Sequence, residues 1–599
     1  MIKTLCDLKP SASILRARVR RRLSHARPGD DQGIALIMVM GFIVVLGLLM
    51  TAALGYAMQA QPQERRDQAW QAALAAAQAG VDDYVARLNG DDNYYDSVDC
   101  TNVAMKGPKL AGSCGLTASS PAQWKEVKPG DPSAGAYHYD VDATNLFRDG
   151  YMMLTVTGRQ LNEYRTLQVR VGKPGSTQYL YYTDFESADP SNRTAYPPNG
   201  TTSNTCGRSG TSLAKYWWQG RSGCQEIQFI GADTLDGPVH FNDTPLIGNS
   251  GATFKKGFET ADPDCKSVTG PNWSGCGRTS TNPNIPAGQK ARWSNVLTLP
   301  DTSDQLDSAD RSCKFSGDTR IKFLTDGTMQ VWSKRAPVSV GGLSCGSLGT
   351  VSGGNIHTTT TNRLNHVNGQ NLPQPDEALI YIKNGPSTSR CATTGQIGDG
   401  IPLNNDWNYK NTTSPENAFY CGNGNAYIEG TVKARLSVGA QNHIFVTGNL
   451  LLSGVTAGQA PSGPYMVGLI AANSVYVYHP ITCSSVYSSG SRKGMCETGS
   501  NILSNTTRYI YASIQTLQHS FTVQVYDVGA KIGDLAVRGS IAQRWRGAVG
   551  TGSGWASTGY DKDYGYDTRL VYSSPPYFPK LDGAGWGSKV TGEVKPVYG

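Results

Sequence analysis

The hydrophobic pattern separates one long apolar run near the N-terminus from a much longer region of short alternating stretches. Residues 34–60 form 27 consecutive positions without a charged side chain. As an α-helix, this run would be roughly 40 Å long, enough to cross a hydrocarbon layer of about 30 Å. A buried core helix of this length usually carries a polar stripe. The pattern therefore predicts a membrane-spanning helix over residues 34–60.

A second helical pattern follows directly after the apolar run. On an otherwise polar background, apolar residues recur at steps of four and three. They are Trp70, Leu74, Ala77, Val81, Tyr84 and Leu88. Asn89 and Gly90 supply a C-terminal stop. We expect one helix over residues 34–89, with a bend at Pro62, a lipid-facing half and a half that packs on a soluble domain.

Residues 90–175 alternate turn signals with period-two stretches, which is typical of antiparallel strands with one polar face. Strands are expected at residues 137–141, 151–156 and 164–171, with a glycine-containing link at residues 157–163 between the last two. The second half of the helix would cover the other face of this small sheet.

Residues 176–599 have almost no helical periodicity and are rich in Gly, Asn, Ser and Thr. An aliphatic-x-Gly-x-aliphatic pattern recurs around Gly237, Gly430, Gly448 and Gly539. The copies at Gly430 and Gly448 stand 18 residues apart, which suits one coil of a β-solenoid in which glycine turns a corner. A β-sandwich is the alternative, because short strands with frequent turns occur in both.

Composition and charge narrow the class of protein. The 599 residues are 39% hydrophobic and 17% charged and include 69 glycines, which excludes a disordered polyelectrolyte and a polytopic membrane protein. The net charge is +7, but the first 33 residues alone carry eight Lys or Arg and three Asp. This basic leader favours a cytoplasmic N-terminus with the remainder outside the membrane. The nearly neutral remainder gives no indication of a nucleic-acid partner.

The cysteines indicate an oxidising compartment. Cys6 lies in the leader, and twelve others follow the apolar run. Consecutive members are 11 to 32 residues apart within six successive pairs, and none has the short spacing of a zinc site. We expect six sequential disulfides from Cys100, Cys114, Cys206, Cys224, Cys265, Cys276, Cys313, Cys345, Cys391, Cys421, Cys483 and Cys496.

The N-terminal arrangement resembles that of type IV prepilins. Within that superfamily, QGIALIMVMGFIVVLGLLM followed by RRDQAWQAALAAAQAGVDDYVARL is most similar to PilX-type pilus assembly proteins. The resemblance implies that a prepilin peptidase cuts between Gly33 and Ile34. Asp30, Asp31 and Gln32 depart from the basic residue that often precedes the glycine.

A second departure concerns the fifth mature position. The major pilins that this chain resembles have a glutamate at that position, which neutralises the amino terminus of a neighbouring subunit. This chain has Met38 instead. An ammonium group without a counter-charge is costly in lipid or in a packed core, so the resemblance implies a tip or priming subunit.

Several ectodomain segments are similar to the solenoid-like ectodomains that follow PilX-type N-termini. They are residues 179–190, 237–244, 539–550, 560–567 and 574–578. The resemblance implies architecture and surface location rather than chemistry. Pro575 and Pro576 would end the solenoid, and Tyr577 and Phe578 would cap exposed coil edges.

Candidate chemistry is sparse. No catalytic or nucleotide-binding motif occurs, so no catalytic residue, cofactor or metal ligand is assigned. His240 is the one histidine beside a candidate acid, Asp243. Two acidic stretches, Asp82–Asp96 and Asp301–Asp310, offer oxygen ligands for calcium, but neither has the EF-hand order, and solvated turns are favoured. The aromatic clusters Tyr216–Trp218 and Arg544–Arg546 suit stacking on sugars or capping of strand edges.

These observations favour a non-catalytic minor pilin-like subunit of a type IV pilus or related secretion filament, with a tip, priming or adhesion role. Its partners would be a prepilin peptidase, other pilin subunits and membrane lipid, with a surface glycan or host protein as a further ligand. It would sit in a bacterial inner membrane with the C-terminal part outside, and on the pilus or cell surface after assembly. The alternative is a membrane-anchored glycan-binding or glycan-active β-solenoid protein.

Overall fold

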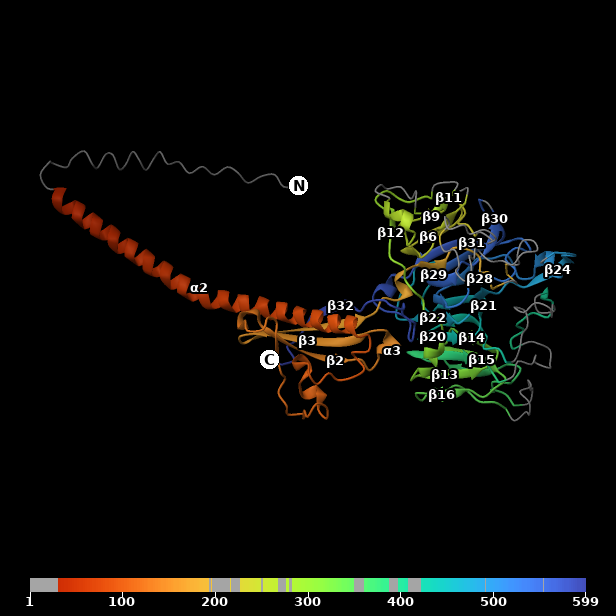
Figure 1. The fold of residues 1–599 in the computed structure, drawn as a ribbon, viewed down its shortest axis with the longest axis horizontal. Coiled ribbons are helices and arrows are strands. Elements are labelled where there is room, and N and C mark those ends of the chain that lie inside the picture. The colour runs from red at the N-terminus through yellow and green to blue at the C-terminus, as the bar shows by residue number, and fades with distance from the viewer. Residues whose placement is uncertain are drawn as a thin grey trace.

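The computed structural model describes residues 31–192, 195–196, 216, 227–248, 251–267, 276–279, 283–349, 360–386, 397–407, 422–490, 492–552 and 554–598. A long helix extends from a small sheet, and a larger β-rich body lies beyond that sheet (Figure 1). The prediction of a mainly β protein with a long N-terminal helix is confirmed.

Helix α2 (Asp31–Gly90) is continuous and contains Pro62 in its interior. The side chains of Ala35–Tyr56 are all exposed, and Ala69 is the first buried side chain among those that the structure describes. From there the buried positions are spaced like the predicted stripe, but the stripe starts one residue earlier than expected. Trp70, expected to face the sheet, is 40% exposed.

The small sheet is antiparallel and has the strand order β1-β2-β3-β4-β32. Its strands are β1 (Lys125–Glu126), β2 (Ala136–Asp142), β3 (Met152–Gln160), β4 (Glu163–Gly172) and β32 (Gly587–Val594). The three strands expected between residues 137 and 171 are present. The expected link at residues 157–163 is shorter than predicted, because β3 continues to Gln160.

Small residues allow α2 to lie very close to this sheet. A side chain at Gly158 of β3 would place its Cβ 2.0 Å from the Ala73 carbonyl oxygen and 2.4 Å from the Ala77 nitrogen. On the helix, a Cβ at Gly80 would lie 2.6 Å from Val156 Cγ1. Gly158 is therefore required by packing within a strand, not by a turn.

The last strand of the small sheet comes from the far end of the chain. β32 pairs with β4, with Gly587 opposite Gly172. Residues 587–594 were expected within the ectodomain that begins at residue 176, yet they lie in the small sheet. The whole β-rich body is consequently an insertion between two neighbouring strands of that sheet (Figure 1).

The inserted body is built mainly from parallel ladders on two faces. The first face contains β5 (Tyr181–Phe185), β7 (Val239–Phe241), β10 (Phe258–Thr260), β12 (Ala291–Trp293), β13 (Ser312–Ser316), β18 (Ala378–Lys383), β20 (Arg435–Ala440), β22 (Met466–Ala471) and β27 (Ser513–Thr516). The second contains β6 (Thr234–Asp236), β9 (Thr253–Phe254), β14 (Thr319–Phe323), β19 (Ala426–Val432), β21 (Ile444–Leu452), β23 (Val475–Val477), β26 (Arg508–Ile510), β28 (Phe521–Val523) and β31 (Ala556–Tyr566). Strand β29 (Lys531–Trp545) contributes to both faces.

Antiparallel additions and short elements complete the described structure. β15 (Thr328–Ser333), β16 (Val338–Val340), β17 (Gln370–Pro373) and β30 (Gly550–Gly552) pair antiparallel at the edges, while β8 (Leu246–Ile247) pairs with β11 (Arg278–Thr279), and β24 (Ile481–Val486) with β25 (Cys496–Asn501). The short helices are α3 (Leu146–Asp149), η1 (Val103–Met105), η2 (Pro108–Leu110), η3 (Pro132–Ala134), η4 (Ser176–Gln178), η6 (Pro263–Ser267), η7 (Asp304–Ser308) and η9 (Thr568–Val571).

Successive coils stack as the glycine spacing predicts. β19 pairs in parallel with β21, and Ile428 stands opposite Val446, which lies 18 residues further along the chain. On the other face, β18, β20 and β22 form a parallel ladder. The aliphatic side chains between the two faces form the core. Parallel stacking of this kind gives a solenoid-like body and not the antiparallel β-sandwich that was the alternative.

Two separate stacks of coils meet inside the body. The chain enters at β5 and builds through β7 and β10 to β12, then returns to β13 and builds back to β29, which pairs with β5. At this seam, Arg546 donates to Glu186 Oε2 at 2.6 Å, and both side chains are fully buried. Removing either partner of this pair would leave the other charge buried and uncompensated at the seam.

Four disulfides lie in the described part of the chain. They join Cys100 to Cys114, Cys265 to Cys276, Cys313 to Cys345, and Cys483 to Cys496. Each links consecutive cysteines, in an order that matches the expected pattern. The other two expected pairs, from Cys206, Cys224, Cys391 and Cys421, lie outside the described residues, as does Cys6.

The segment that returns from the inserted body to the small sheet packs on the side of the first face. Tyr577 and Phe578 are buried against a cluster that includes Leu379, Tyr381 and Ile470. Tyr577 also accepts the ring of Phe147 edge-on, at 5.4 Å between centroids. These two aromatic residues therefore join the two parts of the molecule and do not cap a coil edge as expected.

Candidate functional site

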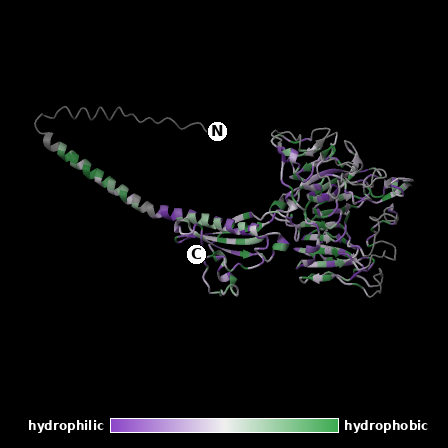
Figure 2. Ribbon diagram, viewed as in Figure 1, coloured by the Kyte–Doolittle hydropathy of each residue, from purple (hydrophilic) through white to green (hydrophobic). Residues whose placement is uncertain are grey.

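The exposed half of α2 is the most distinctive surface of the molecule. Ala35–Tyr56 are 22 residues, none of them buried, and they form the one helix among the described residues that is long and apolar enough to cross a membrane. Figure 2 shows this apolar stretch projecting away from the rest of the protein. The Thr51 hydroxyl donates to the Gly47 carbonyl oxygen at 3.0 Å, so its polar group is satisfied within the helix.

The residues expected at the processing site lie at the N-terminal end of this helix. Gly33 and Ile34 fall within α2, and the basic leader before Asp31 lies outside the described residues. Met38, four residues after Ile34, is 70% exposed on the apolar half. Whether the chain is cut at Gly33 stays a prediction.

A charged collar, residues 64–67, separates the apolar half from the packed half. All four side chains are exposed, and Arg66 bonds Glu163 at 2.9 Å, which ties the collar to the β3–β4 turn. Next to it, the Arg165 guanidinium lies 4.7 Å from the centre of the Trp70 ring and pairs with Glu593 of β32 at 2.5 Å. Charges and an amphipathic aromatic ring are therefore gathered where an anchored helix would leave the lipid.

His240 does not pair with Asp243, the partner suggested by the sequence. Its Nδ1 lies 3.0 Å from Glu259 Oε1 on the next coil, and its Nε2 lies 2.9 Å from Asn242 Oδ1. Asp243 instead accepts the Glu186 backbone N–H at 2.7 Å. Burial raises the pKa of Glu259, but hydrogen bonds from His240 and Tyr179 and nearby positive charge overcome this and lower it to about 2. His240 is thus fully buried in a structural network.

The two acidic stretches are occupied by ion pairs and hydrogen bonds. Asp83 pairs with Lys125 at 2.8 Å and with Arg87 at 3.2 Å, and Asp307 pairs with Lys383 at 2.6 Å. Within the described ranges, no group of three or more potential ligand residues is arranged to hold a metal ion.

In the aromatic cluster at residues 544–546, Trp545 and Arg546 are buried and Arg544 is partly exposed, paired with Asp301 at 2.5 Å. Trp545 is buried and stacks on Phe185 at 4.2 Å between ring centroids, across the seam of the two stacks. Of the other cluster, Tyr216 is half-buried, and Trp217 and Trp218 lie outside the described residues. The cluster at 544–546 therefore offers no surface for stacking on a sugar.

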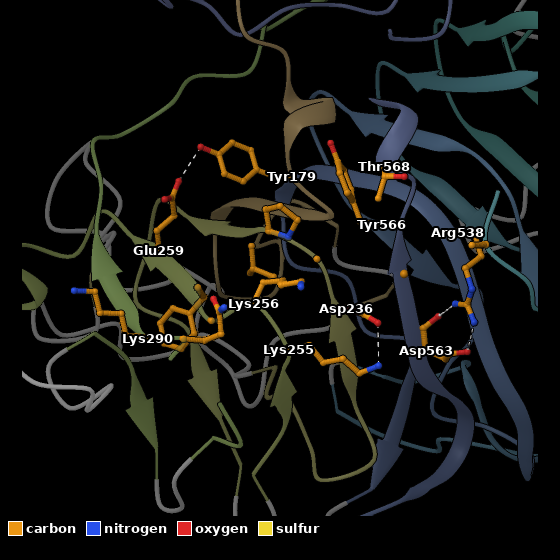
Figure 3. Close-up of a pocket in the computed structure, with 18 of the residues that line it drawn as sticks. Tyr179, Asp236, Lys255, Lys256, Glu259, Lys290, Arg538, Asp563, Tyr566 and Thr568 are labelled. Atoms are coloured by element: carbon orange, nitrogen blue, oxygen red, sulfur yellow. Dashed lines mark hydrogen bonds and ion pairs between the residues drawn. The ribbon is translucent and has the colours of Figure 1, made fainter. Parts of the chain in front are cut away.

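Sequence reasoning missed a groove that runs along one corner of the inserted body. Its volume is about 850 Å³ (Figure 3). Its wall consists of corners of successive coils, at Arg538, Tyr566, Gly237, Lys255–Gly257 and Gly288–Lys290. Coils repeat at about 4.8 Å, so five corners extend over roughly 20 Å. We call this the corner groove.

Positive charge is in excess in the corner groove. It is lined by the five cationic residues Lys255, Lys256, Lys290, Arg292 and Arg538, and by the three carboxylates Asp236, Glu259 and Asp563. Three ion pairs connect them: Lys255 with Asp236 at 2.9 Å, Arg292 with Glu259 at 3.2 Å, and Arg538 with Asp563 at 2.6 Å. Lys256 and Lys290 are exposed and pair with no carboxylate in the described part of the chain.

Of the four glycines in the predicted pattern, only Gly237 lines this groove, and Gly257 at the next corner lies outside the pattern. Gly237 stands at the corner between β6 and β7, where a Cβ would lie 2.6 Å from Tyr566 Cβ. Gly257 has a φ of +68°, and a Cβ there would lie 2.2 Å from the Lys290 carbonyl oxygen. The pattern marked corners, but it did not show that lysines from separate coils gather beside them.

Comparisons with known proteins give little further information. No family model and no curated protein matches the chain. Among solved structures, it matches the competence-associated pilin ComZ from Thermus thermophilus at 11% identity, over 88% of this chain and 97% of that chain, with a TM-score of 0.24. A TM-score this low does not show a shared fold, so no family is assigned.

Proposed function

We propose that the protein is a non-catalytic minor pilin-like subunit of the PilX type, which displays its inserted body at the tip or surface of a type IV pilus or related filament. The observation that carries the proposal is helix α2, one continuous rod with an unburied apolar half and a half packed on a small sheet. The resemblance of residues 32–88 to PilX-type N-termini and the disulfides of the ectodomain support it.

The proposal assigns each part of the helix a role. The apolar half holds the subunit in the inner membrane and later packs among the helices of other pilin subunits. A prepilin peptidase cuts between Gly33 and Ile34. Met38 leaves the subunit without the carboxylate that would neutralise a neighbouring amino terminus, which favours a first or accessory place in the filament.

N-terminal sequencing and filament composition test this proposal. The protein recovered from its host membrane should begin at Ile34, and it should be found in sheared filaments at far lower amounts than the main subunit. Met38→Glu should increase its share of the filament shaft, whereas Met38→Gln, which has no charge, should not. An intact leader, or normal filaments after deletion of the gene, would contradict the proposal.

The corner groove favours a second candidate, a membrane-anchored glycan-binding protein with no role in filaments. The two candidates share the anchor and the displayed body but differ in one outcome. Deletion should leave filament assembly unchanged under the second candidate and impair it under the first.

A further inference from the structure

We propose that the corner groove binds an acidic oligosaccharide that lies along the axis of the coils. The inference adds a ligand site to the displayed body and holds whether or not the protein enters a filament. It is carried by three features of the groove: its repeat, its mixture of polar groups and its excess of positive charge.

The repeat of the groove suits a chain of sugars. Each coil advances by about 4.8 Å, which is comparable to the length of one sugar residue. Corners from five coils therefore present a row of sites to successive residues of one linear ligand. Glycines at Gly237, Gly257, Gly288 and Gly565 line the groove and keep side chains from filling it.

The side chains of the groove offer aromatic rings, cations and hydrogen-bond acceptors to a sugar chain. Tyr179 and Tyr566 stand at one side of the groove, with Lys255, Lys256 and Lys290 opposite them (Figure 3). The tyrosine hydroxyls are already bonded, to Glu259 at 2.8 Å and to the Thr177 carbonyl oxygen at 2.9 Å, which fixes the rings for stacking. The carboxylates of Asp236 and Asp563 are about half exposed and face the groove as acceptors for sugar hydroxyls.

The charge balance selects an acidic sugar over other polymers. Lys256 and Lys290 come from adjacent coils and carry no counter-charge, so each is available for a charge-assisted bond to a ligand carboxylate. Nucleic acid is disfavoured, because Asp236 and Asp563 would face its phosphates and cations are not continuous along the groove. An apolar peptide is disfavoured by the eight charged residues of the lining.

The test uses the full-length protein in an uncharged detergent, with short oligomers of galacturonate, mannuronate and hyaluronan as probes in titration calorimetry. At least one should bind saturably, and its methyl-esterified form, which lacks the charge, should bind at least tenfold more weakly. Lys256→Gln combined with Lys290→Gln should weaken binding by about tenfold or more, since two charge-assisted bonds are lost. Lys433→Gln combined with Lys493→Gln, at exposed lysines outside the groove, is the matched control and should bind as the unsubstituted protein does.

Four results would overturn the inference. They are the absence of saturable binding to all three oligomers, equal binding of the methyl ester, equal loss in both double variants, and displacement of the probe by duplex DNA at equal or higher affinity. None of these outcomes bears on the processing of the N-terminus or on filament assembly, so the ligand site and the proposed function fail independently.

Discussion

Gly158 shows how a single residue determines the distance between a helix and a sheet. Replacement by valine would force atoms into the backbone of Ala73 and Ala77, which cannot move without displacing α2. We expect Gly158→Val to reduce the stability of this contact by about 1–3 kcal/mol. Hydrogen–deuterium exchange over residues 73–88 should become faster.

The control for this substitution lies in the same sheet. Gly592 in β32 has open space where a Cβ would be, so Gly592→Val should leave exchange in α2 unchanged. Equal effects of the two valines would mean that the close approach at Gly158 is not what holds the helix.

Ionisation of Glu259, in β10 of the first face, makes the stability of the inserted body depend on pH. His240, Tyr179 and Arg292 face its carboxylate, and its pKa lies at about 2 compared with an ordinary value of 4.5. Because the folded state holds the ionised form, this group adds stability above about pH 4.5 and loses it as the pH falls toward 2. The contribution at neutral pH is at most about 3 kcal/mol.

Urea unfolding between pH 6 and pH 3 measures this contribution. Glu259→Gln should be less stable than the unsubstituted protein at pH 6, and the difference should shrink as the pH falls. Glu497→Gln, at an exposed carboxylate of β25, controls for the loss of one acidic group. A difference that stayed constant across this range would show that the carboxylate is not the titrating group.

At the scale of elements, helix α2 contains two segments with different surroundings. One is exposed and apolar, as a membrane span requires, and the other packs on the small sheet. A lysine near the middle of a membrane span costs about 2.5–3.5 kcal/mol, so Val45→Lys should move the protein from the membrane pellet toward the soluble fraction in carbonate extraction. Gln78→Lys, on the exposed side of the packed half, should stay in the pellet. Recovery of both variants in the soluble fraction would instead indicate that a lysine anywhere in the helix disturbs folding.

Periodic elements were predictable because their signals are local. Apolar spacing defined the helix from Leu74 to Leu88, alternation defined β2, β3 and β4, and the interval from Gly430 to Gly448 matched one coil. Each of these signals concerns residues within about one coil or two turns of one another. The packed stripe was predicted to start at Trp70. The Trp70 ring instead contacts the Arg165 guanidinium and stays partly exposed.

At the scale of the whole molecule, the features that escaped prediction depend on which side chains meet between coils and not on a repeated spacing along the chain. His240 pairs with Glu259 on the next coil, Lys256 and Lys290 line the same groove from neighbouring corners, and Arg546 meets Glu186 across the seam. No local pattern marks these contacts, because register between coils depends on loop lengths that vary along the chain. The candidate groove was therefore visible only in three dimensions.

The return of the chain to the small sheet gives a prediction at this scale. Deletion of residues 587–599 removes β32 and leaves the edge of β4 unpaired, while the ladders of the inserted body remain intact. Limited proteolysis should therefore cut the small sheet first and leave the inserted body as a stable fragment. Simultaneous loss of both parts would show that the two fold as one cooperative unit.

The pairing of β4 with β32 also sets the order in which the small sheet forms while the chain is being synthesised. β4 is synthesised roughly 400 residues before its partner β32, so its edge stays unpaired until the inserted body and β32 have followed. A chain that stops before β32 would keep that edge unpaired beside the packed half of the helix. Closure of the small sheet consequently requires that the inserted body has been synthesised first.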